Sequence, residues 1–107
     1  MAEKDLRKRF PQRLLALLPG PFFYHKISDA AGLGGNKPFD AVLLYEGIMY
    51  GIEYKSKSGR VTAYQKHHLS EVVKAGGRSL VVVEGEDLDY IIKDVIIQER
   101  SRAEGTD

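Results

Sequence analysis

The fold depends on one stretch, PFDAVLLYEGIMYGIEYK, which covers residues 38–55. It consists of two apolar runs that only Glu46 and Gly47 separate. Two apolar runs joined by two residues ending in Gly are typical of a β-hairpin. A two-residue loop also fixes the pairing register, so that Tyr45 faces Ile48 and every further pair follows from that one.

The register brings two acids together. Asp40 falls opposite Glu53, and Lys55 follows on the same face of the strand. Paired residues have Cβ atoms about 4.5–5.5 Å apart, and two carboxylates at that distance repel each other. We therefore expect that one acid takes up a proton or that a cation lies between them. On this basis Asp40→Asn should leave the metal-free protein no less stable, and Gly51 on the same face should leave the surface open.

Two carboxylates, a metal ion and a lysine on one sheet face suit the hydrolysis of a phosphodiester. Mg²⁺ binds through one or two carboxylates and keeps several waters, and it lowers the pKa of a bound water. The alternative is that these charges are solvated at the strand ends, where Lys55 neutralises either acid. Acyl transfer fits poorly because no Ser-His or Cys-His arrangement is present, and the histidines form no HExxH zinc pattern.

Around the hairpin, the sequence predicts a mixed α/β fold in the order α-β-β-β-α-β-α. Apolar spacing predicts a first helix in which Pro11 either introduces a kink or marks a restart. Thr62 and Gln65 have the spacing of a capping box, and Asp87 is a candidate cap for the last helix. The expected helices are 3–18, 62–75 and the segment after Asp87, and the expected strands are 22–27, 38–45, 48–55 and 79–85.

Length and composition set the class of protein. The 107 residues predict a single domain over 1–98, followed by a flexible C-terminal tail over 99–107. The chain has no cysteine, which excludes disulfides and thiolate metal sites. No long apolar run follows the charged N-terminus, so we expect no signal peptide and no membrane span. The expected location is cytoplasmic, that is, intracellular, and the protein is either nucleoid-associated or phage-encoded in a host cell.

The net charge of +1 hides an asymmetry along the chain. Residues 1–79 carry a net charge of +6, whereas residues 80–107 carry −5. A basic body attracts a polyanion such as DNA. The alternative is that the charges only keep the surface soluble.

The ordered motifs resemble a known family. Pro38-Phe39-Asp40 followed by Glu53-Tyr54-Lys55 is similar to the PD-(D/E)xK nuclease signature, with a Phe inserted between Pro and Asp. Residues 22–84 resemble the virus-type replication-repair nuclease (VRR-NUC) modules and the Holliday junction resolvases of bacteria and phages. The shared features are a Gly-rich loop before the Asp, a Glu-x-Lys strand, a Gln early in the next helix, and Ala-Gly-Gly before a hydrophobic strand.

The resemblance implies a fold and a set of roles. The fold would be the restriction-endonuclease-like core, a mixed central sheet flanked by helices, with an added C-terminal helix. Asp40, Glu53 and the backbone carbonyl of Tyr54 would bind Mg²⁺, for which Mn²⁺ can substitute, and Lys55 would orient the attacking water. Gln65 would reach the active site, or else would only complete its capping box. An acid on the first helix would join the metal site, with Glu3 as the first candidate and Asp5 as the second. The candidate phosphate contacts are His25, Lys26, Lys57 and Arg60.

The expected function is that of a metal-dependent endodeoxyribonuclease acting on branched or otherwise structured DNA. Its rivals are a restriction- or repair-type nuclease acting on duplex or single-stranded DNA, and a non-catalytic nucleic-acid-binding module of the same fold. Junction resolvases act as dimers, which raises the question of a homodimer here. The last helix has more apolar residues than one buried stripe needs, which fits either a dimer interface or a well-covered core helix. These residues are Ile91, Ile92, Val95, Ile96 and Ile97.

Overall fold

The computed structural model describes residues 3–28 and 37–98. The tail predicted over 99–107 lies outside these residues. The described elements follow the expected order and form a mixed α/β structure, which confirms the coarse fold class. The helical elements are α1 (Glu3–Leu17), α2 (Ala63–Lys74), α3 (Leu88–Tyr90) and the π-helix η1 (Ile91–Ile97). The strands are β1 (Phe22–Lys26), β2 (Ala41–Tyr45), β3 (Ile48–Lys55) and β4 (Arg78–Val83).

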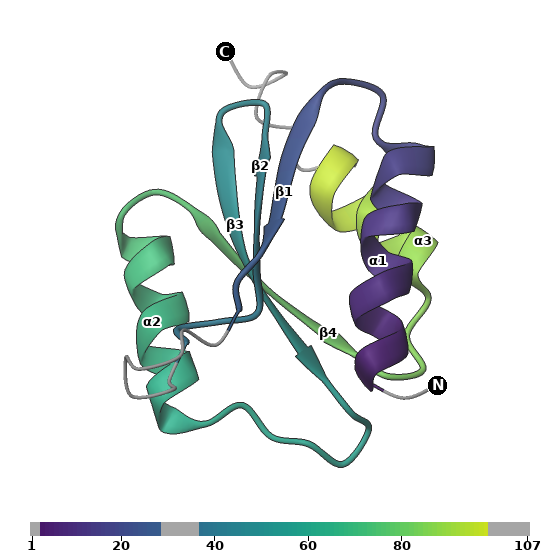
Figure 1. Ribbon diagram of the computed structural model, residues 1–107. Helices are drawn as coiled ribbons and strands as arrows, with labels where there is room; N and C mark the ends of the chain where they lie inside the picture. The colour runs from purple at the N-terminus through teal and green to yellow at the C-terminus, as the bar shows by residue number, and fades with distance from the viewer. Residues whose placement is uncertain (1–2, 29–36, 99–107) are drawn as a thin grey trace.

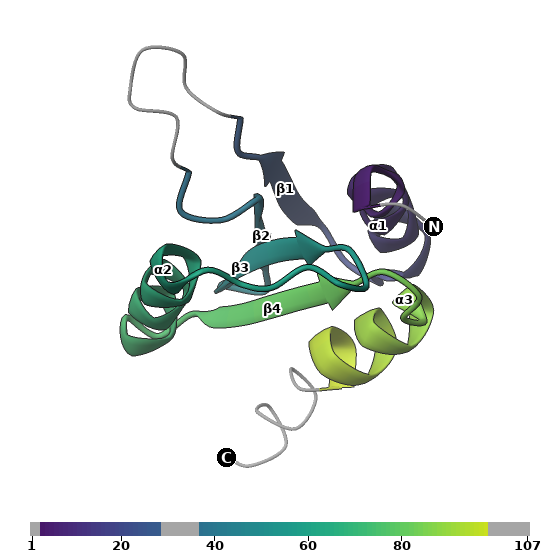
Figure 2. The same cartoon turned by 90° about the horizontal axis from the view of Figure 1, so that it is seen from below.

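The four strands form one sheet in the order β1-β2-β3-β4. The pairs β1–β2 and β2–β3 are antiparallel, and β3–β4 is parallel. Helix α1 and the C-terminal helical segment lie on one side of the sheet and α2 lies on the other (Figure 1; Figure 2). The first face holds the main core, in which Leu6, Phe10 and Leu14 of α1 are buried. None of the helices within the described residues is long and apolar enough to cross a membrane.

The β2–β3 hairpin has the predicted register, from Tyr45 opposite Ile48 to Ala41 opposite Ile52. The reason is local. Glu46 and Gly47 have φ angles of 51° and 80°, and the primed two-residue turn that matches the twist of a hairpin requires positive φ at both positions. The turn therefore determines which residues of β3 face α2 and which face the main core.

Two expectations about the helices need refinement. Helix α1 runs through Pro11 without interruption, so the restart alternative is wrong. The last helix begins at the predicted Asp87 cap, whose side chain accepts a hydrogen bond from the N–H of Tyr90, but it continues as a π-helix. All five apolar residues named above in this segment are buried or pack against the core, which favours the core-helix alternative. A homodimer remains a prediction.

Candidate metal and phosphodiester site

Asp40 lies where β2 and β3 separate. Its N–H donates to the carbonyl oxygen of Ile52 at 2.8 Å, one residue out of the hairpin register. The N–H of Tyr54, which points toward the same edge of β3, donates to Asp40 Oδ2 at 2.8 Å. The direct pairing thus ends at Ala41 and Ile52, and the Asp40 carboxylate takes the place of the next ladder partner. Because the N–H and C=O of one strand residue point to the same edge, the Tyr54 carbonyl also points to the β2 side of β3.

Two cationic side chains hold the other oxygen of Asp40. Lys37 Nζ and Arg7 Nη1 each lie 3.0 Å from Asp40 Oδ1, and Asp40 is only 1% exposed. Burial alone would raise the pKa of Asp40. The hydrogen bonds from Tyr54 and Lys37 and the charge of Arg7 outweigh burial, so the pKa of Asp40 lies below its ordinary value. Asp40 is therefore the carboxylate that stays charged.

Glu53 has the opposite electrostatic environment. It is also 1% exposed, and its Oε2 accepts from Gln65 Nε2 at 2.8 Å and lies 3.3 Å from Lys55 Nζ. Its Oε1 is buried and has no hydrogen-bond partner among the described residues. Burial, the charge of Asp40 and the hydrogen bond that only a protonated Glu53 can donate to Asp40 raise the pKa of Glu53 to about 7, although Lys55 partly opposes this rise. Of the two acids, Glu53 is the one that takes up a proton.

This asymmetry corrects one expectation from the sequence. Asp40→Asn was expected to leave the metal-free protein no less stable, because only repulsion between the acids was considered. The structure gives Asp40 three donors, of which Arg7 lies 33 positions away in the sequence. Removing the charge of Asp40 weakens all three interactions, whereas removing the charge of Glu53 relieves the repulsion.

Gln65 makes contacts that belong to both of the alternatives left open by the sequence, the capping box and a hydrogen bond to Glu53. Its backbone N–H donates to Thr62 Oγ1, and its Oε1 accepts from the N–H of Thr62, which completes the capping box of α2. Its Nε2 also donates to Glu53 Oε2. The box fixes where α2 begins, and the same side chain links this end of α2 to β3.

Gly51 does not leave the surface open, so that expectation is wrong. A Cβ at Gly51 would lie 3.3 Å from Leu69 Cδ2 of α2 and 3.4 Å from the Phe39 ring. These two side chains fill the space beside Gly51. The small residue allows α2 to approach the sheet, and access to the carboxylates is not through this position.

Helix α1 contributes a positively charged side chain, Arg7, to the site. Arg7 contacts Asp40, and its guanidinium carbon lies 5.9 Å from the centre of the Tyr54 ring. Glu3 begins α1, but its side chain lies outside the described residues, so its predicted role as a metal ligand stays a prediction, as does that of Asp5. Sequence reasoning missed both Arg7 and Lys37. The spacing of Lys37, three residues before Asp40, was a visible signal, whereas no local pattern marks Arg7.

The four candidate DNA contacts are exposed side chains at two places in the fold. His25 and Lys26 lie on the edge strand β1, where the ring of His25 stacks on that of Phe23. Lys57 and Arg60 lie in the segment between β3 and α2. These positions leave all four available to a polyanion, and their role as phosphate contacts stays a prediction.

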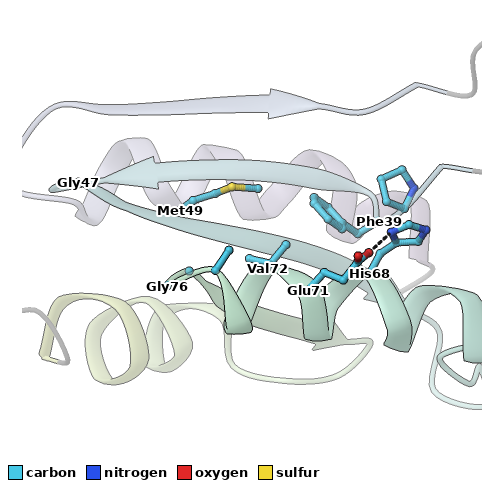
Figure 3. A pocket seen from close by; sticks show the side chains of 10 residues that line it. Phe39, Gly47, Met49, His68, Glu71, Val72 and Gly76 are labelled. Atoms are coloured by element: carbon cyan, nitrogen blue, oxygen red, sulfur yellow. Dashed lines mark ion pairs between the residues drawn. The ribbon is translucent and has the colours of Figure 1, made fainter.

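A groove of about 570 Å³ lies between the sheet and α2 (Figure 3). Phe39, Met49 and Val72 line it, and an ion pair between His68 and Glu71 lies near the Phe39 end. Among the described side chains, none of those predicted from the sequence as catalytic or metal-binding lines this groove. The carboxylates therefore form a separate site, defined by their mutual contact and burial.

The residues present fit a divalent cation. The buried Oε1 of Glu53 lacks a donor among the described residues, and the proximity of Asp40 raises the pKa of Glu53. A cation shared by both carboxylates would remove both penalties. The described residues contain no cluster of three or more His, Cys, Asp or Glu side chains. Two carboxylates with water and substrate oxygens are, however, a common ligand set for Mg²⁺.

Comparison with known proteins assigns no family, because no protein-family model matches the chain and no curated protein matches it significantly.

Proposed function

We propose that the protein is a Mg²⁺-dependent DNA endonuclease that hydrolyses phosphodiester bonds, with Mn²⁺ as a substitute. The observation that carries the proposal is the buried contact between Asp40 and Glu53, in which Glu53 Oε1 has no donor among the described residues. Above the pKa of Glu53, where both acids are charged, an unpaired buried carboxylate oxygen destabilises the fold unless a cation compensates for it. The restriction-endonuclease-like core is part of the same proposal, and the order of the helices and strands supports it.

Each residue has a role that follows from its position. Asp40, Glu53 and the carbonyl of Tyr54 would hold the ion. When bound, Mg²⁺ supplies positive charge beside the scissile phosphate and makes water more acidic. The Lys55 ammonium lies 3.3 Å from Glu53 Oε2, and the Lys55 side chain is 15% exposed, so the ammonium can donate hydrogen bonds to an attacking water and to the phosphate. Gln65 keeps the Glu53 carboxylate in one orientation through its 2.8 Å hydrogen bond.

The substrate we propose is branched or otherwise structured DNA. The motif order of residues 22–84 supports this choice through its resemblance to junction resolvases. The exposed basic side chains of β1 and of the segment after β3 provide contacts for a polyanion. Binding that depends on phosphate contacts weakens as salt rises. Cleavage and binding should therefore both decrease steeply between low and moderate salt.

A panel of substrates tests the proposal. Duplex, single-stranded, flap and four-way DNA are incubated with the protein in Mg²⁺, in Mn²⁺ and in chelator. Cleavage of the four-way or flap DNA is expected only with metal, and Asp40→Asn or Lys55→Ala should abolish it while DNA binding persists. Lys93→Ala, which removes an exposed lysine of η1, serves as the matched control and should cleave normally. If all four substrates stay intact with either metal, the enzyme proposal is wrong and a binding module becomes the better description.

A further inference from the structure

Asp40 interacts with two cations that are held very differently. Arg7 extends from α1 and lies over the Tyr54 ring as well as beside Asp40 Oδ1. Lys37 reaches the same oxygen at 3.0 Å, and within the described residues Asp40 is its one ion-pair partner. The Lys37 side chain is 22% exposed, whereas that of Asp40 is 1% exposed. Lys37 therefore lies between the buried carboxylate and solvent.

A divalent ion shared by Asp40 and Glu53 has to compete for these oxygens. In the metal-free protein, Asp40 Oδ2 accepts from the N–H of Tyr54 and Oδ1 contacts both cations. The lysine side chain is a point charge on a flexible four-carbon stem, so it can leave its position at a lower cost than a stacked guanidinium. Of the two cations, Lys37 is the one that an incoming ion would displace.

We infer that Lys37 is a positioning residue whose ammonium takes the place of a divalent cation at Asp40 and is displaced when that cation binds. This inference rests on the proposed function, because it requires a metal at the two carboxylates. Lys37 would then have two opposite effects. It stabilises the metal-free protein by pairing with Asp40, and it weakens metal binding by occupying a ligand oxygen.

The opposite signs of these effects provide the test. Mn²⁺ binding is measured by electron paramagnetic resonance for the wild type, Lys37→Met and Lys37→Gln, and thermal unfolding is measured in chelator. Both variants should bind Mn²⁺ about tenfold more tightly, which corresponds to the loss of one partly buried ion pair. In chelator both should unfold about 5–10 °C below the wild type. A purely structural Lys37 would instead lower both stability and metal affinity.

Lys66→Met is the matched control. It removes the same charge from an exposed position on α2 beside Gln65, and no contact joins Lys66 to either carboxylate among the described residues. Its Mn²⁺ affinity should change less than twofold, since exposed charges interact weakly across water. If the Lys37 variants bind Mn²⁺ no more tightly than the wild type, the inference is wrong and the proposed function is unaffected. If no protein in the set binds Mn²⁺, the metal site and the inference both fail.

Discussion

The raised pKa of Glu53 makes the metal-free protein sensitive to pH in a direction that can be worked out. In the unfolded chain the ordinary pKa of this group is 4.5, whereas in the folded protein it is about 7. The folded state therefore holds the proton over a range in which the unfolded state has lost it. Stability due to this group is fully present below pH 4.5, falls as pH rises toward 7, and is lost above it.

The size of this loss follows from the same two values. The difference between 4.5 and about 7 corresponds to about 3 kcal/mol of unfolding free energy. Because Glu53 is 1% exposed, solvent screens this penalty little. Glu53→Gln supplies a neutral side chain of the same size that still accepts from Gln65 Nε2. We expect it to be more stable than the wild type by up to about 3 kcal/mol at pH 8 and close to it at pH 4.5.

Urea unfolding in chelator at pH 4.5 and pH 8 measures this difference directly. Taking the difference between variant and wild type at each pH cancels the other titrating groups that the two proteins share. Asp94→Asn, which removes an acidic charge from η1 where the described residues provide no hydrogen bond or ion pair, is the control and should change stability by less than about 0.5 kcal/mol at either pH. If the Glu53→Gln variant is less stable than the wild type at pH 8, the reasoning is refuted, because a favourable partner must then hold Glu53 in its charged form.

Three further outcomes follow from contacts in the structure, each measured by urea unfolding in chelator. Asp40→Asn should destabilise the protein by about 2 kcal/mol, since it weakens hydrogen bonds to a charged acceptor; an unchanged or higher stability would contradict the donors assigned to it. Thr62→Ala removes a cap and should cost about 1 kcal/mol. Gln65→Ala should cost more, because it also removes the hydrogen bond to the buried Glu53, and equal losses would show that this hydrogen bond contributes nothing to stability. Gly77→Ala should cost at least about 1 kcal/mol, since its Cβ would lie 2.8 Å from the carbonyl oxygen of Met49, and a neutral effect would mean that this contact relaxes freely.

The part of the fold that could be predicted from the sequence is the part determined locally. The Glu46-Gly47 turn sets the hairpin register because its two residues adopt positive φ, and the spacing of Thr62 and Gln65 sets the start of α2. The mixed sheet follows from the order of the apolar runs. The change from α-helix to π-helix after Tyr90 could not be predicted, because apolar residues spaced three and four apart fit both helix types.

The electrostatics of the site could be predicted only in outline. The register brought Asp40 and Glu53 together, but which one keeps its charge depends on donors that no local pattern reveals. Arg7 arrives from another layer of the fold, and the Tyr54 N–H is free to bind Asp40 only because the strands separate there. Pairing rules assume that the ladder continues, and here it ends one residue before the acid.

The difference between the two acids bears on why the site exists. A protein that needed this region only for packing would be more stable with Gln at position 53, since a neutral amide removes the repulsion and replaces the unpaired oxygen with an NH2 group that can donate to Asp40. Glu53 instead keeps a charge that destabilises the metal-free fold above its pKa. Residues that lower stability in this way are expected where function requires them. A cation bound at Asp40 and Glu53 would pair with this charge, so that the same charge would favour metal binding. A nucleic-acid-binding module without a metal would gain nothing from it.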